Sequence, residues 1–233
     1  MPYNLYSLYR QAHEQRGNVL IIILIAIALI AALSVAIQGS STNNAQIDKE
    51  TLILRVTQIR QYASELERGI VYVMQNGISE NDIRFSHPLA PASYGDLSAD
   101  ADQSDQLFSI RGGGAQYRAP PQDISGAENW EFFGQSALPG VGSDEAELIA
   151  VLPDVTMDFC AMMNKSIGYE GQPEDSGTCL KAPNSKRFGD GEQFSSSPNT
   201  TEEDSFSIVP AKQGCVQCTS SGAYHFYHVL MSR

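Results

Sequence analysis

Residues 19–37 read VLIIILIAIALIAALSVAI, a run of 19 residues without a charge, in which Ser34 is the only polar side chain. An α-helix of this length spans roughly 28 Å, close to the thickness of the hydrocarbon core of a bilayer. A core helix of a soluble protein would show a polar stripe, and this run has none. We therefore expect residues 18–38 to form a membrane-spanning helix.

The residues on either side of this run indicate its orientation. Residues 1–17 are mostly polar and include Arg10, Arg16 and one acidic residue, whereas the first charges after the run appear only at Asp48–Glu50. This small excess of positive charge places the N-terminus in the cytoplasm. The remainder of the chain would then be exported, as a single-pass protein of the bacterial inner membrane with its C-terminal head in the periplasm.

The charge of the whole chain limits its partners. The 233 residues carry 15 Lys and Arg against 27 Asp and Glu, a net charge of −12. Without residues 1–17, which hold two arginines and one glutamate, 13 basic residues face 26 acidic ones. A nucleic-acid binder needs a basic face to neutralise phosphates, so we predict no nucleic-acid partner.

Three kinds of processing are compatible with this N-terminus. Ser34 and Ala36 are small residues in the −3 and −1 positions for an ordinary signal peptidase cutting after Ala36, although the apolar run exceeds the usual length of such a signal. The run could also stay uncleaved as an anchor. In the third case, a polar leader ends at Gly17 and the cut falls before the apolar run.

The sequence Arg16-Gly17-Asn18-Val19-Leu20 resembles the start of the type IV pilin and pseudopilin family, and the resemblance covers residues 10 to about 76. It implies a leader of residues 1–17, cleavage between Gly17 and Asn18 by the prepilin peptidase, methylation of Asn18, and other pilin or pseudopilin subunits as partners. The family usually has Phe at the first mature position and Glu at the fifth, where this chain has Asn18 and Ile22. The missing carboxylate favours a minor subunit at the filament tip over a bulk subunit.

A second helix is predicted within residues 39–77. Apolar residues recur in steps of four and three, which marks one continuous helical stripe, and Asn76-Gly77 can end the helix. Two packing modes remain open, against the chain's own head or as a parallel coiled coil between chains. Residues 39–51 contain poor helix formers, so we expect a frayed or bent stretch there. The stripe consists of Leu52, Val56, Ile59, Ala63, Leu66, Ile70 and Val73, and the solvent face carries Arg60, Glu65, Glu67 and Arg68.

Residues 78–233 change character and read as a β-rich head, with short apolar runs separated by turn residues. One helix is expected over residues 155–167, capped by Asp154 and ended by Gly168. The predicted fold class is α+β, with a long N-terminal hydrophobic-then-amphipathic helix packed on a small antiparallel β-sheet head. The predicted strands are residues 106–111, 129–133, 147–152, 206–209 and 223–231.

Four cysteines, Cys160, Cys179, Cys215 and Cys218, all lie in the head. An even count in an exported domain predicts two disulfides, with three possible pairings. Cys215 and Cys218 form a CxxC, but it precedes a predicted strand, whereas the thioredoxin-type redox site opens a helix. A zinc site is disfavoured because Cys160 and Cys179 are too far apart in sequence to supply a second CxxC.

Other candidate sites are weaker. Asp96, Asp100, Asp102 and Asp105 share one loop, where carboxylates could ligate calcium, although the glycine and terminal glutamate of an EF-hand are missing. No triad of nucleophile, base and acid is identifiable, so we expect neither an enzyme nor a cofactor.

The sequence therefore predicts a minor type IV pilin-like or pseudopilin subunit. It would be inserted in the inner membrane, processed, and assembled into a pilus or secretion pseudopilus. Two alternatives remain, an uncleaved single-pass protein with an exported binding or adhesion head, and a secreted domain released after Ala36.

Overall fold

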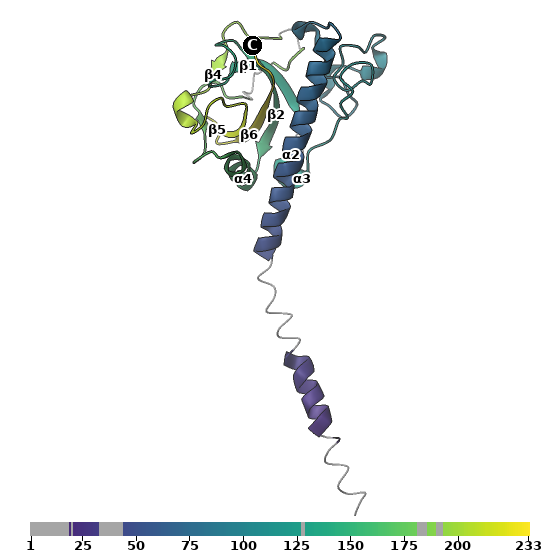
Figure 1. Cartoon of the computed structure of the whole chain (residues 1–233), viewed down its shortest axis with the longest axis vertical. Coiled ribbons are helices and arrows are strands. Elements are labelled where there is room, and N and C mark those ends of the chain that lie inside the picture. The colour runs from purple at the N-terminus through teal and green to yellow at the C-terminus, as the bar shows by residue number, and fades with distance from the viewer. Residues whose placement is uncertain (1–18, 20, 33–43, 127–128, 181–185, 190–192) are drawn as a thin grey trace, which may run out of the picture. The chain divides into compact units, whose positions relative to one another are not determined.

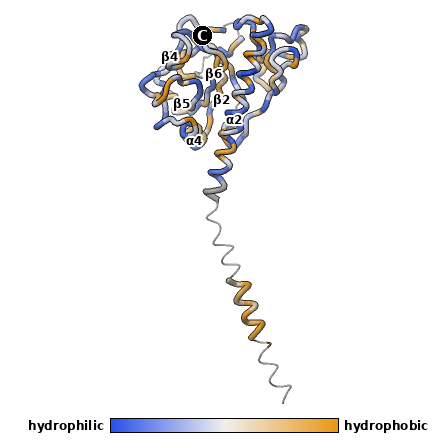
Figure 2. The backbone as a smooth tube through the Cα atoms, in the orientation of Figure 1, coloured by the Kyte–Doolittle hydropathy of each residue, from blue (hydrophilic) through white to orange (hydrophobic). Residues whose placement is uncertain are grey.

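The computed structural model describes residues 19, 21–32, 44–126, 129–180, 186–189 and 193–233, with only the backbone of 44–47. The contacts divide the chain into two compact units, Met1–Glu50 and Thr51–Arg233. Residues 21–32 are helical, and Figure 2 shows them as a continuous hydrophobic segment. No helix of the described residues combines the length and hydropathy that a bilayer crossing requires. The expected span of 18–38 lies partly outside those residues. The predicted leader, residues 1–17, and residues 33–43 lie wholly outside them.

Helix α2 (Asn44–Gln75) is the longest helix of the described residues, and its apolar stripe is buried as the spacing predicted. From here on, the head means the compact unit Thr51–Arg233, which includes most of α2. Exposure is 3% or less at the six stripe residues from Val56 to Val73. Helix α2 ends where the sequence predicted, since Gly77 adopts φ = +87° and donates its N–H to the carbonyl of Met74. The stripe packs on the chain's own sheet. Of the two predicted packing modes, this is packing against the chain's own head.

The sheet has six strands in the order β3-β5-β6-β2-β1-β4. The three central pairings, β5 with β6, β6 with β2 and β2 with β1, are antiparallel. The two outer pairings, β3 with β5 and β4 with β1, are parallel. The strands are β1 (Glu131–Ala137), β2 (Glu147–Val155), β3 (Glu174–Asp175), β4 (Asn199–Thr200), β5 (Gln213–Cys218) and β6 (Tyr224–Met231).

The predicted fold class is wrong in its antiparallel sheet, and the predicted continuous stem helix lies partly outside the described residues. The sheet is mixed, not antiparallel, because the long polar segment 171–204 adds the two-residue strands β3 and β4 in parallel at the two edges. No long apolar helix continuing into an amphipathic one is present in the described part of the chain. The short strands have no alternating pattern, so periodicity could not reveal them.

Two predicted strands are also absent from the described residues. Residues 106–111 form tight turns, in which Gly113 donates its N–H to the carbonyl of Gln106, and only an isolated bridge joins Arg84 to Gln106. The predicted strand 206–209 is likewise absent there, since residues 207–210 form bends. Strand β5 was not predicted, because Gln-Gly-Cys-Val-Gln-Cys lacks the alternation that marks a half-buried strand.

The sheet is covered on both faces, and the inner strand β2 shows how. Leu148, Ala150 and Leu152 face the larger core with α2 and α4 (Met157–Ile167), whereas Ile149 and Val151 face a second core under the loops. Figure 1 shows α2 lying across the sheet. Burial on both faces explains why β2 is a continuous apolar run.

The remaining helices are short. Helix α4 ends at Gly168 as predicted, but its N-cap is Thr156, whose Oγ1 accepts the N–H of Phe159 at 3.4 Å. The predicted cap, Asp154, instead sits at a bulge near the end of β2 with φ = +50°. The others are α3 (Gln122–Ser125) and the 3-10 turns η2 (Glu80–Asp82), η3 (Ala92–Tyr94), η4 (Leu97–Ala99) and η5 (Glu203–Ser205).

Candidate functional site

The four cysteines form two disulfides, as predicted. Cys160 on α4 pairs with Cys215 on β5, and Cys179 in the polar segment pairs with Cys218 at the end of β5. The two cysteines of the CxxC therefore have different partners and lie along a strand. All four are buried, so both bonds are structural staples, each stabilising the fold by about 3 kcal/mol.

A buried amide supports the first disulfide. The side chain of Asn164 on α4 accepts the N–H of Cys215 at 2.8 Å and donates to its carbonyl at 2.9 Å. Asn164 is only 1% exposed, so these bonds satisfy both ends of an otherwise costly buried amide. Helix α4 is thus fixed to β5 by one covalent bond and two hydrogen bonds.

A buried carboxylate supports the second disulfide. Asp175 on β3 accepts hydrogen bonds from the N–H of Gly177 at 2.9 Å and the side-chain amide of Asn199 at 2.9 Å. Burial nevertheless raises the pKa of Asp175 above its ordinary range. These contacts join the two parallel edge segments of the polar region.

The calcium prediction finds no support. Asp96 and Asp102 accept hydrogen bonds from the side chains and then the N–H groups of Ser98 and Ser104, two residues on, which lowers the pKa of each carboxyl. Asp100 is engaged by the N–H of Asp102 and the amide of Gln106. Asp105 is partly buried, which raises its pKa. Among the described residues, no three acidic, His or Cys side chains gather in a way that could hold a metal ion.

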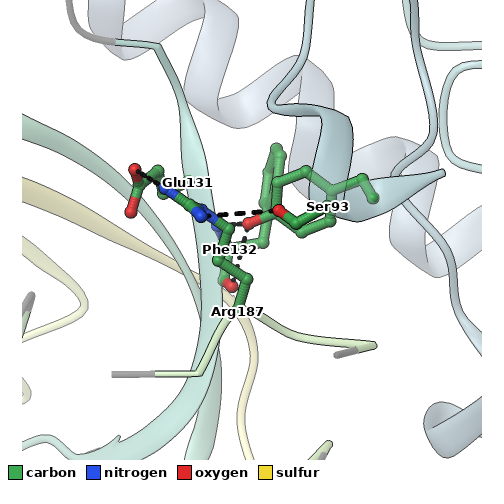
Figure 3. A network of polar contacts seen from close by, with 5 residues as sticks. Ser93, Glu131, Phe132 and Arg187 are labelled. Atoms are coloured by element: carbon green, nitrogen blue, oxygen red, sulfur yellow. Dashed lines mark hydrogen bonds and ion pairs between the residues drawn. The ribbon is translucent and has the colours of Figure 1, made fainter. Parts of the chain in front are cut away.

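A network of polar contacts joins three distant segments beside β1 (Figure 3). Arg187 contacts the buried Glu131 at 2.7 Å and reaches Ser93 at 3.4 Å. The hydroxyl of Tyr94 accepts the N–H of Phe132 at 2.7 Å and lies 3.2 Å from its carbonyl. The network ties η3 and residues 186–189 to the sheet, which is a structural role.

The most distinctive surface of the head is a groove along the outer side of α2, which we call the basic groove. It has a volume of about 810 Å³. Four of its lining residues are cationic, in a chain whose net charge is −12. The lining residues are Thr57, Arg60, Gln61, Ser64, Glu65 and Arg68 of α2, together with Arg118, Lys212, Gln213 and His228.

One flank of the basic groove is held by Arg118. Its guanidinium pairs with Glu65 at 2.6 Å and lies over the ring of Tyr62, 5.4 Å from the centroid. The Tyr62 hydroxyl accepts the N–H of Arg118 at 3.0 Å, and its burial raises the Tyr62 pKa. Arg118 is therefore positioned by both a carboxylate and an aromatic face.

The other flank is held by His228 on β6. Its Nε2 lies 2.9 Å from Oε2 of Glu67, and its Nδ1 lies 3.3 Å from the amide oxygen of Gln213. The hydrogen bond to His228 lowers the pKa of Glu67, and the charges of Lys212 and Arg68 act in the same direction. His228 is buried, with 7% of its surface exposed.

An apolar cleft of about 440 Å³ lies beyond the basic groove, toward the C-terminal end of α2. Val71 and Met74 are 46% and 38% exposed there, which is high for large apolar residues. Lys212 lines both hollows. The residues of the cleft are Glu67, Ile70, Val71, Met74, Gln75, Lys212 and Val229–Ser232.

The sequence partly anticipated this surface. Arg60 and Arg68, two turns apart, were placed on the solvent face of α2 by periodicity. Arg118 and Lys212 lie 50 or more residues further along, and no local pattern links them to the helix. The predicted processing residues Gly17 and Asn18 lie outside the described residues.

No protein-family model, curated protein or solved structure matches this chain.

Proposed function

We propose that this chain is a minor pilin-like or pseudopilin subunit. It is inserted in the bacterial inner membrane, cleaved between Gly17 and Asn18 by the prepilin peptidase, and joined to other subunits at the tip of a pilus or secretion pseudopilus. The observation that carries this proposal is the order of the N-terminal segments, a polar leader ending in Arg16-Gly17 followed at once by the uncharged residues 19–37.

The disulfides support the export that this function requires. Both bonds are buried, and no free cysteine remains. Disulfides persist in the periplasm and outside the cell, whereas cytosolic thiols are kept reduced. A head stapled in this way agrees with the orientation that the charges of residues 10 and 16 favour.

The mechanism under this proposal is assembly without chemistry. The apolar run of one subunit leaves the lipid and packs with its neighbours, while the head presents its surfaces to other proteins. Ile22 occupies the position where a bulk subunit of the family usually has a carboxylate. Without that charge the subunit has no side-chain partner for a neighbour's amino terminus, which suits a place at the end of the filament.

One specific observation favours a second candidate. The same Ile22, together with Asn18 in place of the usual Phe, would equally suit an uncleaved single-pass protein whose exported head binds a ligand. The two candidates differ in the covalent state of the N-terminus.

Two single substitutions separate the processing routes. Gly17→Leu should block the shortening of the chain, because the prepilin peptidase requires a small residue before its cut. Ala36→Leu is the matched control and should leave processing intact, since it affects only an ordinary signal peptidase site. Immunoblots of membrane fractions report the length. The proposal would be contradicted if the Gly17→Leu chain were still shortened, or if the Ala36→Leu chain were no longer shortened.

A further inference from the structure

We propose that the basic groove binds an extended, acidic segment of a partner protein. Arg60, Arg68 and Lys212 line it, and none of the three forms an ion pair with any residue that the structure describes. Arg118 is held in place beside them by Glu65 and Tyr62.

Three arginines elsewhere on the head form ion pairs within the chain. Arg55 pairs with Asp123 at 3.0 Å, Arg187 with Glu131 at 2.7 Å, and Arg233 with Glu80 at 3.2 Å and Glu145 at 3.4 Å. Arg60, Arg68 and Lys212, which form no ion pair with a described residue, gather in one groove, as a surface for an external carboxylate requires.

The spacing on α2 indicates the conformation of the partner. Arg60 and Arg68 are eight residues apart on the same face, which places them about 12 Å apart along the helix axis. An extended strand covers about 12–13 Å in four residues. An extended peptide with carboxylates four residues apart can therefore reach both guanidinium groups at once.

The flanks of the groove add further contacts. Glu65 and Glu67 lie about 200° apart around the helix, so the residues they contact lie on opposite sides of it. Arg118 is on the Glu65 side, and His228 is on the Glu67 side, where the charge of Lys212 also acts on Glu67. Polar side chains between the cations can bond the backbone of a bound segment: Thr57, Gln61, Ser64 and Gln213.

The charge of the molecule favours a short acidic segment over a nucleic acid. A long polyanion would have to approach a head that is strongly negative outside the groove, and it would meet Glu65 inside it and Glu67 beside His228. A peptide with two carboxylates makes contact only where the cations are. This inference does not depend on the proposed function, because an uncleaved membrane protein could use the same surface.

The test is a binding titration of a labelled peptide with the full chain in a non-ionic detergent. Fluorescence anisotropy of the peptide measures the binding. The probe is a labelled seven-residue peptide of Ser and Thr with two glutamates four residues apart. A second peptide of the same composition has its two glutamates adjacent. We expect the spaced peptide to bind more tightly, because only it reaches Arg60 and Arg68 together.

Two variants with the same change in charge show where the peptide binds. Arg60→Gln/Arg68→Gln should weaken binding of the spaced peptide by about tenfold or more, because two charge-assisted hydrogen bonds are lost. Arg111→Gln/Lys165→Gln removes two exposed cations outside the groove and should change binding by less than about twofold. All four side chains are at least partly exposed, and thermal unfolding of each variant verifies that it folds.

Several results would overturn the proposal. These are no measurable binding of the spaced peptide, equal weakening by both double variants, and equal binding of the two peptides. A single-stranded oligonucleotide of seven bases serves as a competitor. If it displaces the peptide from the groove more effectively than the unlabelled peptide does, the groove is a nucleic-acid site.

Discussion

The two faces of helix α2 differ in what their side chains contact. On the inner face, Leu66, Ile70 and Val73 are completely buried against the sheet, and each is fixed by contacts within the chain. On the outer face, Arg60 and Arg68 line a groove without an ion pair among the described residues. The buried residues of the inner face determine whether the head folds, and the cations of the outer face determine which partner it binds.

The largest expected effect is on the inner face. Leu66→Ala should lower the free energy of unfolding by about 3–5 kcal/mol, because it leaves a cavity in a fully packed core. Arg68→Ala, two residues on and exposed, should change it by less than about 0.5 kcal/mol. Urea denaturation of both variants in detergent makes the comparison. Similar losses in the two variants would show that the faces are not energetically distinct.

The carboxylates of Glu147 and Glu67 show the same contrast between a buried and an exposed group. The buried Glu147 gives the next largest expected effect on the free energy of unfolding. Glu147 on β2 is completely buried, one of its oxygens accepts the N–H of Leu138 at 2.9 Å, and the other has no hydrogen-bond partner among the described residues. Desolvation raises its pKa from 4.5 to about 7. The folded state therefore holds this proton more tightly than the unfolded state, and stability falls as pH rises from about 4.5 to 7.

Glu147→Gln removes this titration and keeps an acceptor for Leu138. We expect the variant to be more stable than the wild type by about 3 kcal/mol at pH 8, with little difference at pH 4. Unfolding measured across this pH range reports the change. A variant that is destabilised at pH 8, or equally affected at both pH values, would contradict the assigned protonation.

The exposed carboxylate gives the smallest effect. His228 lowers the pKa of Glu67, so their interaction stabilises the fold above the ordinary pKa of Glu67 and is lost as pH falls through its lowered value. Glu67 is 43% exposed, and solvent screens the pair. Glu67→Gln should therefore cost about 0.5 kcal/mol at pH 6 and less at pH 3. A loss that persists unchanged at pH 3 would show that the contact is not electrostatic.

Local sequence patterns predicted the longer, regular parts of the fold. The stripe of α2, the strands β2 and β6, and the disulfides follow from local patterns and from the cysteine count. The parallel edges do not, because β3 and β4 are two residues long and are held by Asp175 and a disulfide.

The candidate site was harder to foresee for the same physical reason. Arg60 and Arg68 appear in sequence as ordinary solvent residues of a helix. Only the fold brings Arg118 and Lys212 to the same groove, and only the contacts show that Arg118 is paired while Arg60, Arg68 and Lys212 lack ion pairs among the described residues. Charge patterns along a chain cannot distinguish a solvated cation from one aimed at a partner.

The most direct test of the proposed function is the N-terminus of the mature protein, determined by mass spectrometry of membrane and extracellular fractions. The proposal predicts a chain that begins at Asn18 and carries a methyl group on its amino terminus. A chain that begins at Met1 would identify an uncleaved membrane protein, and one that begins at Ile37 a secreted domain. Either result would contradict assembly as a pilin-like subunit.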